Sequence, residues 1–451
     1  MKKSLIVLIW ALAVPAFTAE TVNNDTSPFQ GEYRLAGGGW VTFTRMGVIE
    51  TLAKPLFIDW QSGRYGQVMA AGSDRFVSPP SAKADSPWQS ELLFRRDALG
   101  RVTGLTITEK GEMPKTAEKV EPWIDKEVVF PSAEISLVAT LRLPPGQGPF
   151  PAIVLVHGSG PGTRSQLVVM ASFFARLGMA VLWYDKRGCG GSGGDWKKVD
   201  LEALAADAVA GAKWLRSRPE IDPKRVGAWG ISQGGWITPL AGSLDPELAF
   251  VINSSGPGTS LRRQDTYMMA NVLKAGKIKE EDARLYLAML ATLYDYGRGK
   301  ATAAALDTLN DQIRAIADLK DMALPPARDI NPEMLYAKQA IGDPAWFYHL
   351  DPDRDALAPY RKLRCPLLVT YGKLDMTVPV EESVRLISEA LRTAAHPDFS
   401  VEVLATAGHG FAMMKEGEPP APVQPGRLSR EFFSAIENWL HQRGFCGGEK
   451  K

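Results

Sequence analysis

The strongest constraint on the fold is a glycine-flanked serine that follows an apolar segment and precedes a segment compatible with a helix. The motif is Gly230-Ile231-Ser232-Gln233-Gly234, directly after the apolar residues 226–229. In a strand–turn–helix connection of this kind, small flanking residues let the strand and the helix approach closely while the serine is held on a strained turn. Chance alone would give about 0.2 such motifs in a chain with 42 glycines among 451 residues, so the surrounding sequence decides its meaning.

From residue 127 onward, strand-like segments alternate with helical ones. Continuous apolar runs such as 152–156 and 180–184 are typical of parallel strands that are buried on both faces. Amphipathic segments separate these and later strands, at 166–177, 201–216, 381–391 and 430–441. We therefore expect an α/β fold with a doubly wound, mostly parallel sheet, whose core is formed by residues 125–260 and 346–447.

Two segments before this core have a different composition. Residues 1–19 combine Lys2 and Lys3 with an apolar run that Pro15 interrupts, which is typical of a secretory signal peptide and too short for a membrane span. Residues 20–124 contain short alternating runs and turn signals, which predict a small antiparallel β domain. We expect export to the periplasm or the medium, with no stable membrane insertion after cleavage.

Residues 261–345 interrupt the alternation of strands and helices. They are rich in alanine, leucine, methionine and tyrosine at helical spacing, which predicts a helical cap inserted into the core. Most of its apolar residues are expected to pack within the cap or against the core. Four candidates for lining a substrate pocket are Tyr267, Met268, Tyr294 and Tyr296.

Composition narrows the classes of partner and cofactor. The formal net charge is +1, and no basic run with interleaved aromatic residues occurs, so nucleic acid is not an expected partner. The chain contains three cysteines, Cys189, Cys365 and Cys446. This count indicates neither a disulfide framework nor a cysteine-rich zinc site, although a single disulfide between two of them is compatible with it. We expect a small-molecule substrate and neither a metal nor an organic cofactor. Oligomeric state is left open.

Five sequence blocks in order resemble the α/β-hydrolase superfamily. They are HGSGP at 157–161, YDKRG at 184–188, GISQG at 230–234, YGKLD at 371–375 and GHGF at 408–411. The similarity covers about residues 127–443 and, within the superfamily, is to bacterial esterases and to dienelactone hydrolase and prolyl-oligopeptidase catalytic domains. It implies an α/β-hydrolase fold and hydrolysis through an acyl-enzyme, with the catalytic residues in the order serine, acid, histidine.

The same residues can be argued from chemistry. A serine hydroxyl needs a base to remove its proton, and of the five histidines only His409 follows a late strand in a glycine-flanked loop. Asp375 follows the strand expected at 367–371 and could orient that imidazole, although it could also only cap the next helix. Ser232, Asp375 and His409 are therefore the expected triad. Weaker alternatives for the acid are Asp351, Asp353 and Asp355.

The negative charge that develops on the substrate oxygen needs preorganised donors. We expect the backbone amide of Gln233 as one donor and that of Ser159 as the other, with Gly160 as the alternative to Ser159. The glycine-rich tract 188–194 lacks the Gly-Lys-Ser ending of a phosphate loop, so we expect a loop at the border of the cleft. Asp185 and Arg187 are expected to hold it through an ion pair or backbone hydrogen bonds.

Together these observations predict an exported serine hydrolase that cleaves carboxylic esters. A peptidase, an amidase or a thioesterase could use the same triad. However, residues 20–124 are too few for a propeller, and Gln233 stands where prolyl-oligopeptidases commonly have tyrosine. A non-catalytic ligand-binding protein on a hydrolase scaffold is the alternative from another class, and the three triad residues argue against it.

Overall fold

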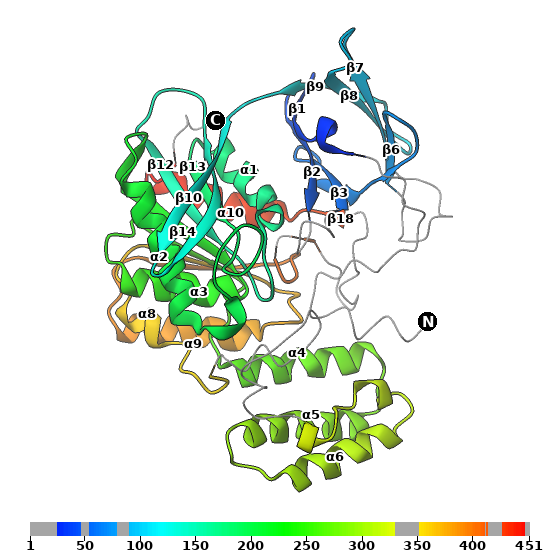
Figure 1. Ribbon diagram of the computed structural model, residues 1–451, viewed down its shortest axis with the longest axis vertical. Coiled ribbons are helices and arrows are strands. Elements are labelled where there is room, and N and C mark those ends of the chain that lie inside the picture. The colour runs from blue at the N-terminus through cyan, green and yellow to red at the C-terminus, as the bar shows by residue number, and fades with distance from the viewer. Residues whose placement is uncertain are drawn as a thin grey trace.

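The computed structural model describes residues 25–46, 54–78, 90–329, 351–410, 412–413 and 426–446. The expected signal peptide (1–19), the end of the expected cap (330–345) and Phe411 lie outside these residues. The described chain forms an eight-stranded sheet, a ten-stranded sheet and a group of helices (Figure 1).

The eight-stranded sheet is mostly parallel. Its strands are β10 (Ile124–Ser132), β11 (Ile135–Leu143), β12 (Phe150–Val156), β13 (Ala180–Tyr184), β14 (Ile221–Ile231), β15 (Val251–Ser254), β16 (Leu367–Gly372) and β17 (Phe399–Leu404). They lie in the order β10-β11-β13-β12-β14-β15-β16-β17. The two pairings that involve β11 are antiparallel and the other five are parallel. The carboxyl ends of the parallel strands therefore meet at one edge of the sheet.

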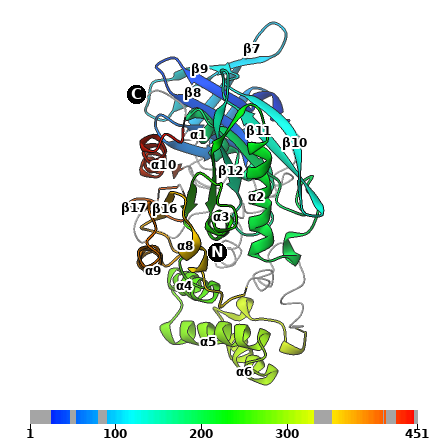
Figure 2. The same cartoon turned by 90° about the vertical axis from the view of Figure 1, so that its left-hand side faces the viewer.

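Helices cover both faces of this sheet. The longest are α1 (Val168–Arg176), α2 (Leu201–Arg216), α3 (Gln233–Leu244), α9 (Val380–Thr393) and α10 (Arg430–Gln442), and a short helix, α8 (Ala358–Lys362), precedes β16. Along β12, Val154 and Val156 pack with α2 and α3, whereas Ile153 and Leu155 pack with α1 and α10. Figure 2 shows α2 and α10 on opposite sides of the strands. The continuous apolar runs are thus strands buried on both faces, as predicted.

The ten-stranded sheet is antiparallel and is built mainly from residues before 121. Its strands are β1 (Gly31–Leu35), β2 (Trp40–Met46), β3 (Lys54–Asp59), β4 (Arg64–Gln67), β5 (Met69–Ala70), β6 (Arg75–Ser78), β7 (Ser90–Arg96), β8 (Val102–Glu109), β9 (Lys115–Val120) and β18 (Gly426–Arg427). Aromatic side chains fill its core, among them Phe43, Phe76 and Phe94. The sequence did not reveal that β18, from the far end of the chain, pairs with β4.

A buried polar cluster joins this N-terminal sheet to α1. Arg176 donates to Glu32 over 2.6 Å and to Thr42 over 2.9 Å, and Ser172 donates to Glu32 over 3.0 Å. The Arg176 guanidinium also lies 4.2 Å from the ring centroid of Trp60. These contacts hold the N-terminal sheet against the face of the core that α1 and α10 cover.

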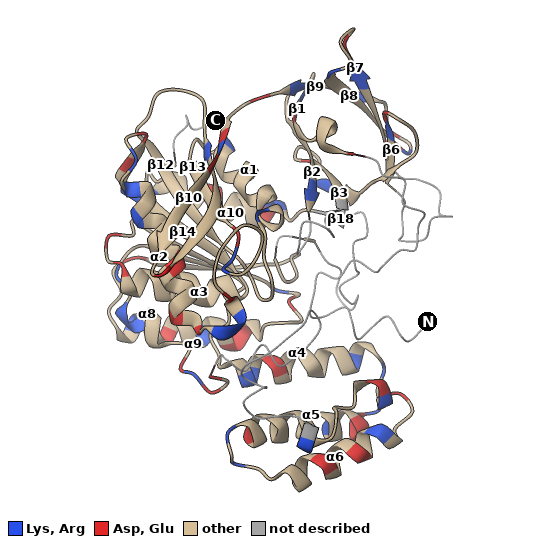
Figure 3. Cartoon of the chain, viewed as in Figure 1, with Lys and Arg blue, Asp and Glu red and all other residues tan. Residues whose placement is uncertain are grey.

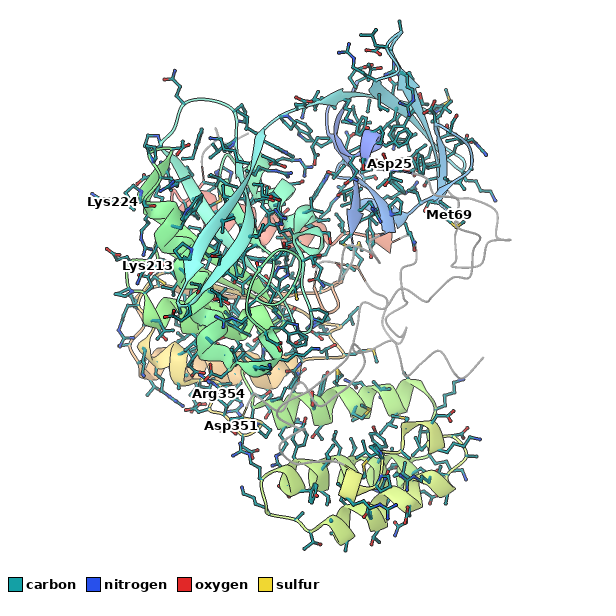
Figure 4. All side chains as sticks on the ribbon, viewed as in Figure 1. Asp25, Met69, Lys213, Lys224, Asp351 and Arg354 are labelled. Carbon is teal, nitrogen blue, oxygen red and sulfur yellow. The ribbon has the colours of Figure 1, made fainter. Side chains whose placement is uncertain are left out.

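Three helices form the described part of the expected cap, α4 (Leu261–Ala275), α5 (Glu280–Gly297) and α6 (Ala303–Ala315). Met289, Leu293 and Leu306 form an apolar core of their own between these helices. Asp351 and Arg354, labelled in Figure 4, lie where the core meets this group, and Arg354 pairs with Glu202 on α2.

Lys and Arg residues and Asp and Glu residues are interspersed along the described helices and strands (Figure 3). In the part of the chain that the structure describes, no helix has both the length and the apolar character needed to cross a membrane.

Candidate active site

Ser232 lies at the carboxyl end of β14, on the turn that leads into α3. Its backbone has φ 58° and ψ −117°, a region that a residue with a Cβ atom rarely adopts. The Ser232 amide donates to the Ser254 carbonyl on β15, and the Ser232 carbonyl accepts from Gly235. These bonds hold the serine in the conformation that its motif predicts.

The glycines of the motif allow this turn to form against β12. A Cβ atom on Gly234 would lie 2.6 Å from the Val156 carbonyl oxygen, and one on Gly230 would lie 2.3 Å from the Gly234 carbonyl oxygen. Both distances are shorter than any ordinary contact, so each position requires glycine because the backbone approaches too closely.

Asp375 and His409 are brought together in the loops after β16 and β17. The His409 Nδ1 atom lies 2.8 Å from Asp375 Oδ2. An ionised carboxylate can only accept, so Nδ1 carries the proton and leaves Nε2 free to take one. Asp375 Oδ1 accepts from the amides of Thr377 and Val378, which means that the carboxylate caps the start of the next segment and orients the imidazole at once.

The environment of His409 favours its protonated form. Burial lowers the pKa of His409, but the charge of Asp375 and its hydrogen bond outweigh burial, so the pKa is raised above the ordinary value of 6.5. The Asp375 side chain is fully buried, while that of His409 is 27% exposed. The imidazole can therefore meet a substrate while its partner cannot.

The His409 loop lies beside the serine turn. A Cβ atom on Gly410 would lie 3.2 Å from Ile231 Cδ1, the residue before Ser232. Between these described residues no hydrogen bond joins the Ser232 hydroxyl to the His409 ring. Catalytic hydrogen bonds are often long in ligand-free enzymes and shorten when substrate binds, so the arrangement is compatible with proton transfer.

The turn that follows β12 lies over the start of α3. A Cβ atom on Gly158 would lie 3.6 Å from Ser232 Cβ. His157 is buried, and its Nε2 atom donates to the Tyr184 carbonyl over 2.6 Å, which is a structural role. Burial, together with the charge of Lys186, lowers the pKa of His157 to about 4. This histidine is therefore neutral at ordinary pH and is fully engaged in the fold.

Residues 134–401 match the family described as X-Pro dipeptidyl-peptidase (S15 family), which is more than half of the chain. The chain belongs to this family. It is a hydrolase, as its resemblance to the α/β-hydrolase superfamily implied.

This S15 protein is also similar to several individual proteins. Esterase EstD of Thermotoga maritima is 24% identical over 77% of this chain and 76% of its own length. The quorum-quenching protein AidA of Acinetobacter baumannii is 34% identical over 29% of this chain and 44% of its own length. Among solved structures, esterase Pf2001 of Pyrococcus furiosus is 19% identical, with a TM-score of 0.45, over 71% of this chain and 91% of that one.

The other acidic candidates of the S15 chain have different partners. Asp351 pairs with Arg298, Asp353 with Arg262 and Asp355 with Arg361. Each of these carboxylates is paired with an arginine. Of the four acidic candidates, Asp375 is the one that contacts His409.

The other described histidines also lie apart from the expected triad. His441 is near Glu437 on α10, and burial lowers the pKa of His396, whose Nδ1 accepts from the Asp398 amide. His349 lies outside the described residues.

Helix α4 contacts the loop that carries the acid. The Tyr267 hydroxyl donates to the Asp375 carbonyl over 3.2 Å, and the Asn271 amide donates to the Met376 carbonyl over 2.9 Å. Asn271 had no sequence signal, because its partner is a backbone atom about a hundred residues away. Tyr294 and Tyr296, two of the candidates for lining a pocket, belong instead to the apolar core of α4–α6, where the Tyr294 hydroxyl donates to Asp265 on α4 and the Tyr296 hydroxyl donates to the Ala327 carbonyl.

The glycine-rich tract is held by Asp185 through backbone hydrogen bonds, one of the two expected arrangements, and no ion pair joins Asp185 to Arg187 among the described residues. Asp185 Oδ2 accepts from the Gly191 amide, whereas Arg187 pairs with Asp207 on α2. The three cysteines are free thiols. No group of three or more His, Cys, Asp or Glu side chains suited to a metal ion occurs among the described residues.

Proposed function

We propose that this protein is an exported serine hydrolase that cleaves carboxylic esters, with Ser232 as the nucleophile, His409 as the base and Asp375 as the acid. The observation that carries the proposal is the 2.8 Å hydrogen bond between His409 and Asp375, in a loop packed beside the strained turn of Ser232. A hydroxyl nucleophile, a base and a group that orients the base are the parts that acyl transfer requires.

In the proposed mechanism, His409 Nε2 removes the hydroxyl proton while Ser232 Oγ attacks the ester carbonyl carbon. The tetrahedral intermediate collapses when the imidazolium gives its proton to the leaving alkoxide, and an alcohol and an acyl-enzyme result. His409 then removes a proton from water, the resulting hydroxide attacks the acyl carbon, and the carboxylic acid leaves as Ser232 regains a proton. Asp375 stays ionised and stabilises the imidazolium.

The amides of Gln233 and Ser159 are the proposed donors to the substrate oxygen, with Gly160 as the alternative to Ser159. The Gly158 carbonyl accepts a hydrogen bond from Lys186. In a planar trans peptide, the Ser159 N–H points away from that carbonyl and so away from Lys186. This orientation favours Ser159 as the donor that faces the substrate.

Esters are proposed as substrates because the chain resembles a protein named as an esterase along most of its length. Export is proposed from the two lysines and the apolar run within residues 1–19. Cleavage of X-Pro peptides is a second candidate because that activity gives the matching family its name.

A substrate panel distinguishes these candidates. We expect the wild-type protein to hydrolyse short-chain p-nitrophenyl esters faster than an acyl thioester or an X-Pro p-nitroanilide. Ser232→Ala should lower kcat by about 10⁶-fold, since the triad acts as a unit. Ser243→Ala, a change of the same type on α3, should leave kcat unchanged. Preferential hydrolysis of the anilide would favour the peptidase, and full activity of Ser232→Ala would refute the proposed nucleophile.

A further inference from the structure

We propose that Lys186 is a positioning residue that holds the oxyanion-binding turn in place. This inference rests on the proposed function, since it assigns a role beside the same serine. The Lys186 ammonium donates to the Gly158 carbonyl over 2.7 Å, the Gly160 carbonyl over 2.9 Å and the Gln233 side-chain oxygen over 2.9 Å. It thereby joins the two segments that supply the proposed donors.

The bond to the Gly158 carbonyl fixes the direction of the peptide plane between Gly158 and Ser159. With the Gly158 carbonyl held toward Lys186, the Ser159 N–H is held on the opposite side. The same ammonium holds the side chain of Gln233, whose own amide is the other proposed donor. Loss of Lys186 would free the turn to rotate while leaving every atom of the triad in place.

Burial of the Lys186 ammonium destabilises the fold unless hydrogen bonds compensate for the lost hydration. Lys186 is only 3% exposed, and among the described residues no carboxylate forms an ion pair with it. A buried charge without an ionic partner is destabilising unless hydrogen bonds satisfy it, and here three acceptors use all three ammonium protons. The Trp196 ring packs against the ammonium, with its centroid 5.5 Å from Lys186 Nζ.

The charge of Lys186 is also sensitive to pH. Burial lowers the pKa of Lys186 to about 7, against the opposing influence of Cys189 and Asp207. The neutral ring of His157 is a further titratable group near Lys186, and the carboxylate of Asp185 acts on that ring. A neutral amine has one donor fewer than an ammonium, so the turn should loosen as pH rises through this pKa. The predicted kcat therefore falls on the alkaline side, in addition to its fall on the acid side.

The test compares Lys186→Met with Lys198→Met, using p-nitrophenyl butyrate from pH 5.5 to 9.5. Lys198 lies exposed on the nearby turn Trp196–Lys198 and does not contact the oxyanion turn. Lys186→Met should lower kcat by about 100-fold with little change in KM, which is the loss seen when one oxyanion donor is removed. It should also lack the alkaline fall while keeping the acid one. A kcat and pH profile equal to those of Lys198→Met would overturn the inference.

If Lys186→Met does not fold, a second variant tests the proposed role of Lys186. Gln233→Met keeps the backbone amide but removes one acceptor from Lys186, so kcat should fall about 10-fold and the alkaline fall should move to lower pH. An unchanged kcat and profile would contradict the proposed role. If the wild-type protein neither hydrolyses the ester nor reacts with a fluorophosphonate, the proposed function fails instead.

Discussion

At the scale of single residues, the proposed chemistry depends on the hydrogen bond between Asp375 and His409. Asp375 is buried. Its Oδ1 atom accepts hydrogen bonds from backbone amides, and its Oδ2 atom accepts the hydrogen bond from the imidazole. The pKa of His409 is raised above 6.5, so below this raised pKa the proposed base is protonated and cannot accept the serine proton. We therefore expect kcat/KM to fall as pH drops through a pKa above 6.5.

Asp375→Asn tests this coupling. Without the carboxylate, burial alone acts on His409 and lowers its pKa, so the acid limb of kcat/KM should move to lower pH. The wrong tautomer should lower kcat by about 10⁴-fold. Asp353→Asn, which changes an acid paired with Arg262, is the control and should alter neither quantity. An acid limb at the same pH in Asp375→Asn and the wild type would show that another group sets it.

At the scale of secondary-structure elements, the strand–turn–helix unit of β14 and α3 depends on close backbone approach. Gly234→Ala would push a methyl group into the Val156 and His157 carbonyl oxygens. We expect a loss of about 1–3 kcal/mol in the free energy of unfolding, typical of overpacking, together with a loss of esterase activity. Gly37→Ala is the matched control, since a Cβ atom there meets nothing within 4 Å. Equal unfolding curves for the two variants would contradict the close approach.

At the scale of the whole molecule, the N-terminal sheet is fastened to the core by a buried charge pair. Arg176→Met leaves Glu32 buried without its cation, and breaking such a pair costs about 3–5 kcal/mol in unfolding free energy. Arg101→Met removes a solvent-exposed pair with Asp97 and should leave the free energy of unfolding nearly unchanged. Urea denaturation of the two variants measures the difference. Equal midpoints would show that the cluster does not fasten the two parts.

Much of this architecture could be predicted because it is encoded locally. The buried parallel strands appear as continuous apolar runs, and the Ser232 turn is marked by its own glycines. The position of Asp375 after its strand was also predictable, because parallel strands bring their carboxyl ends to one edge.

What the sequence could not predict depends on distant contacts. β18 has only two residues, and its pairing with β4 spans most of the chain. Lys186 appeared only as one residue of a motif, since its acceptors are backbone carbonyls and a side chain that the fold brings to it. Such partners have no periodicity or composition that a sequence pattern could reveal.

The most direct test of the central claim is to map the residue that a fluorophosphonate modifies. An activated serine reacts with this reagent, whereas the other serines do not, because they lack a positioned base. We predict stoichiometric labelling on the peptide that contains Ser232, and no labelling of the Ser232→Ala protein under the same conditions. Labelling of a different serine, or none of the folded wild-type protein, would contradict the account.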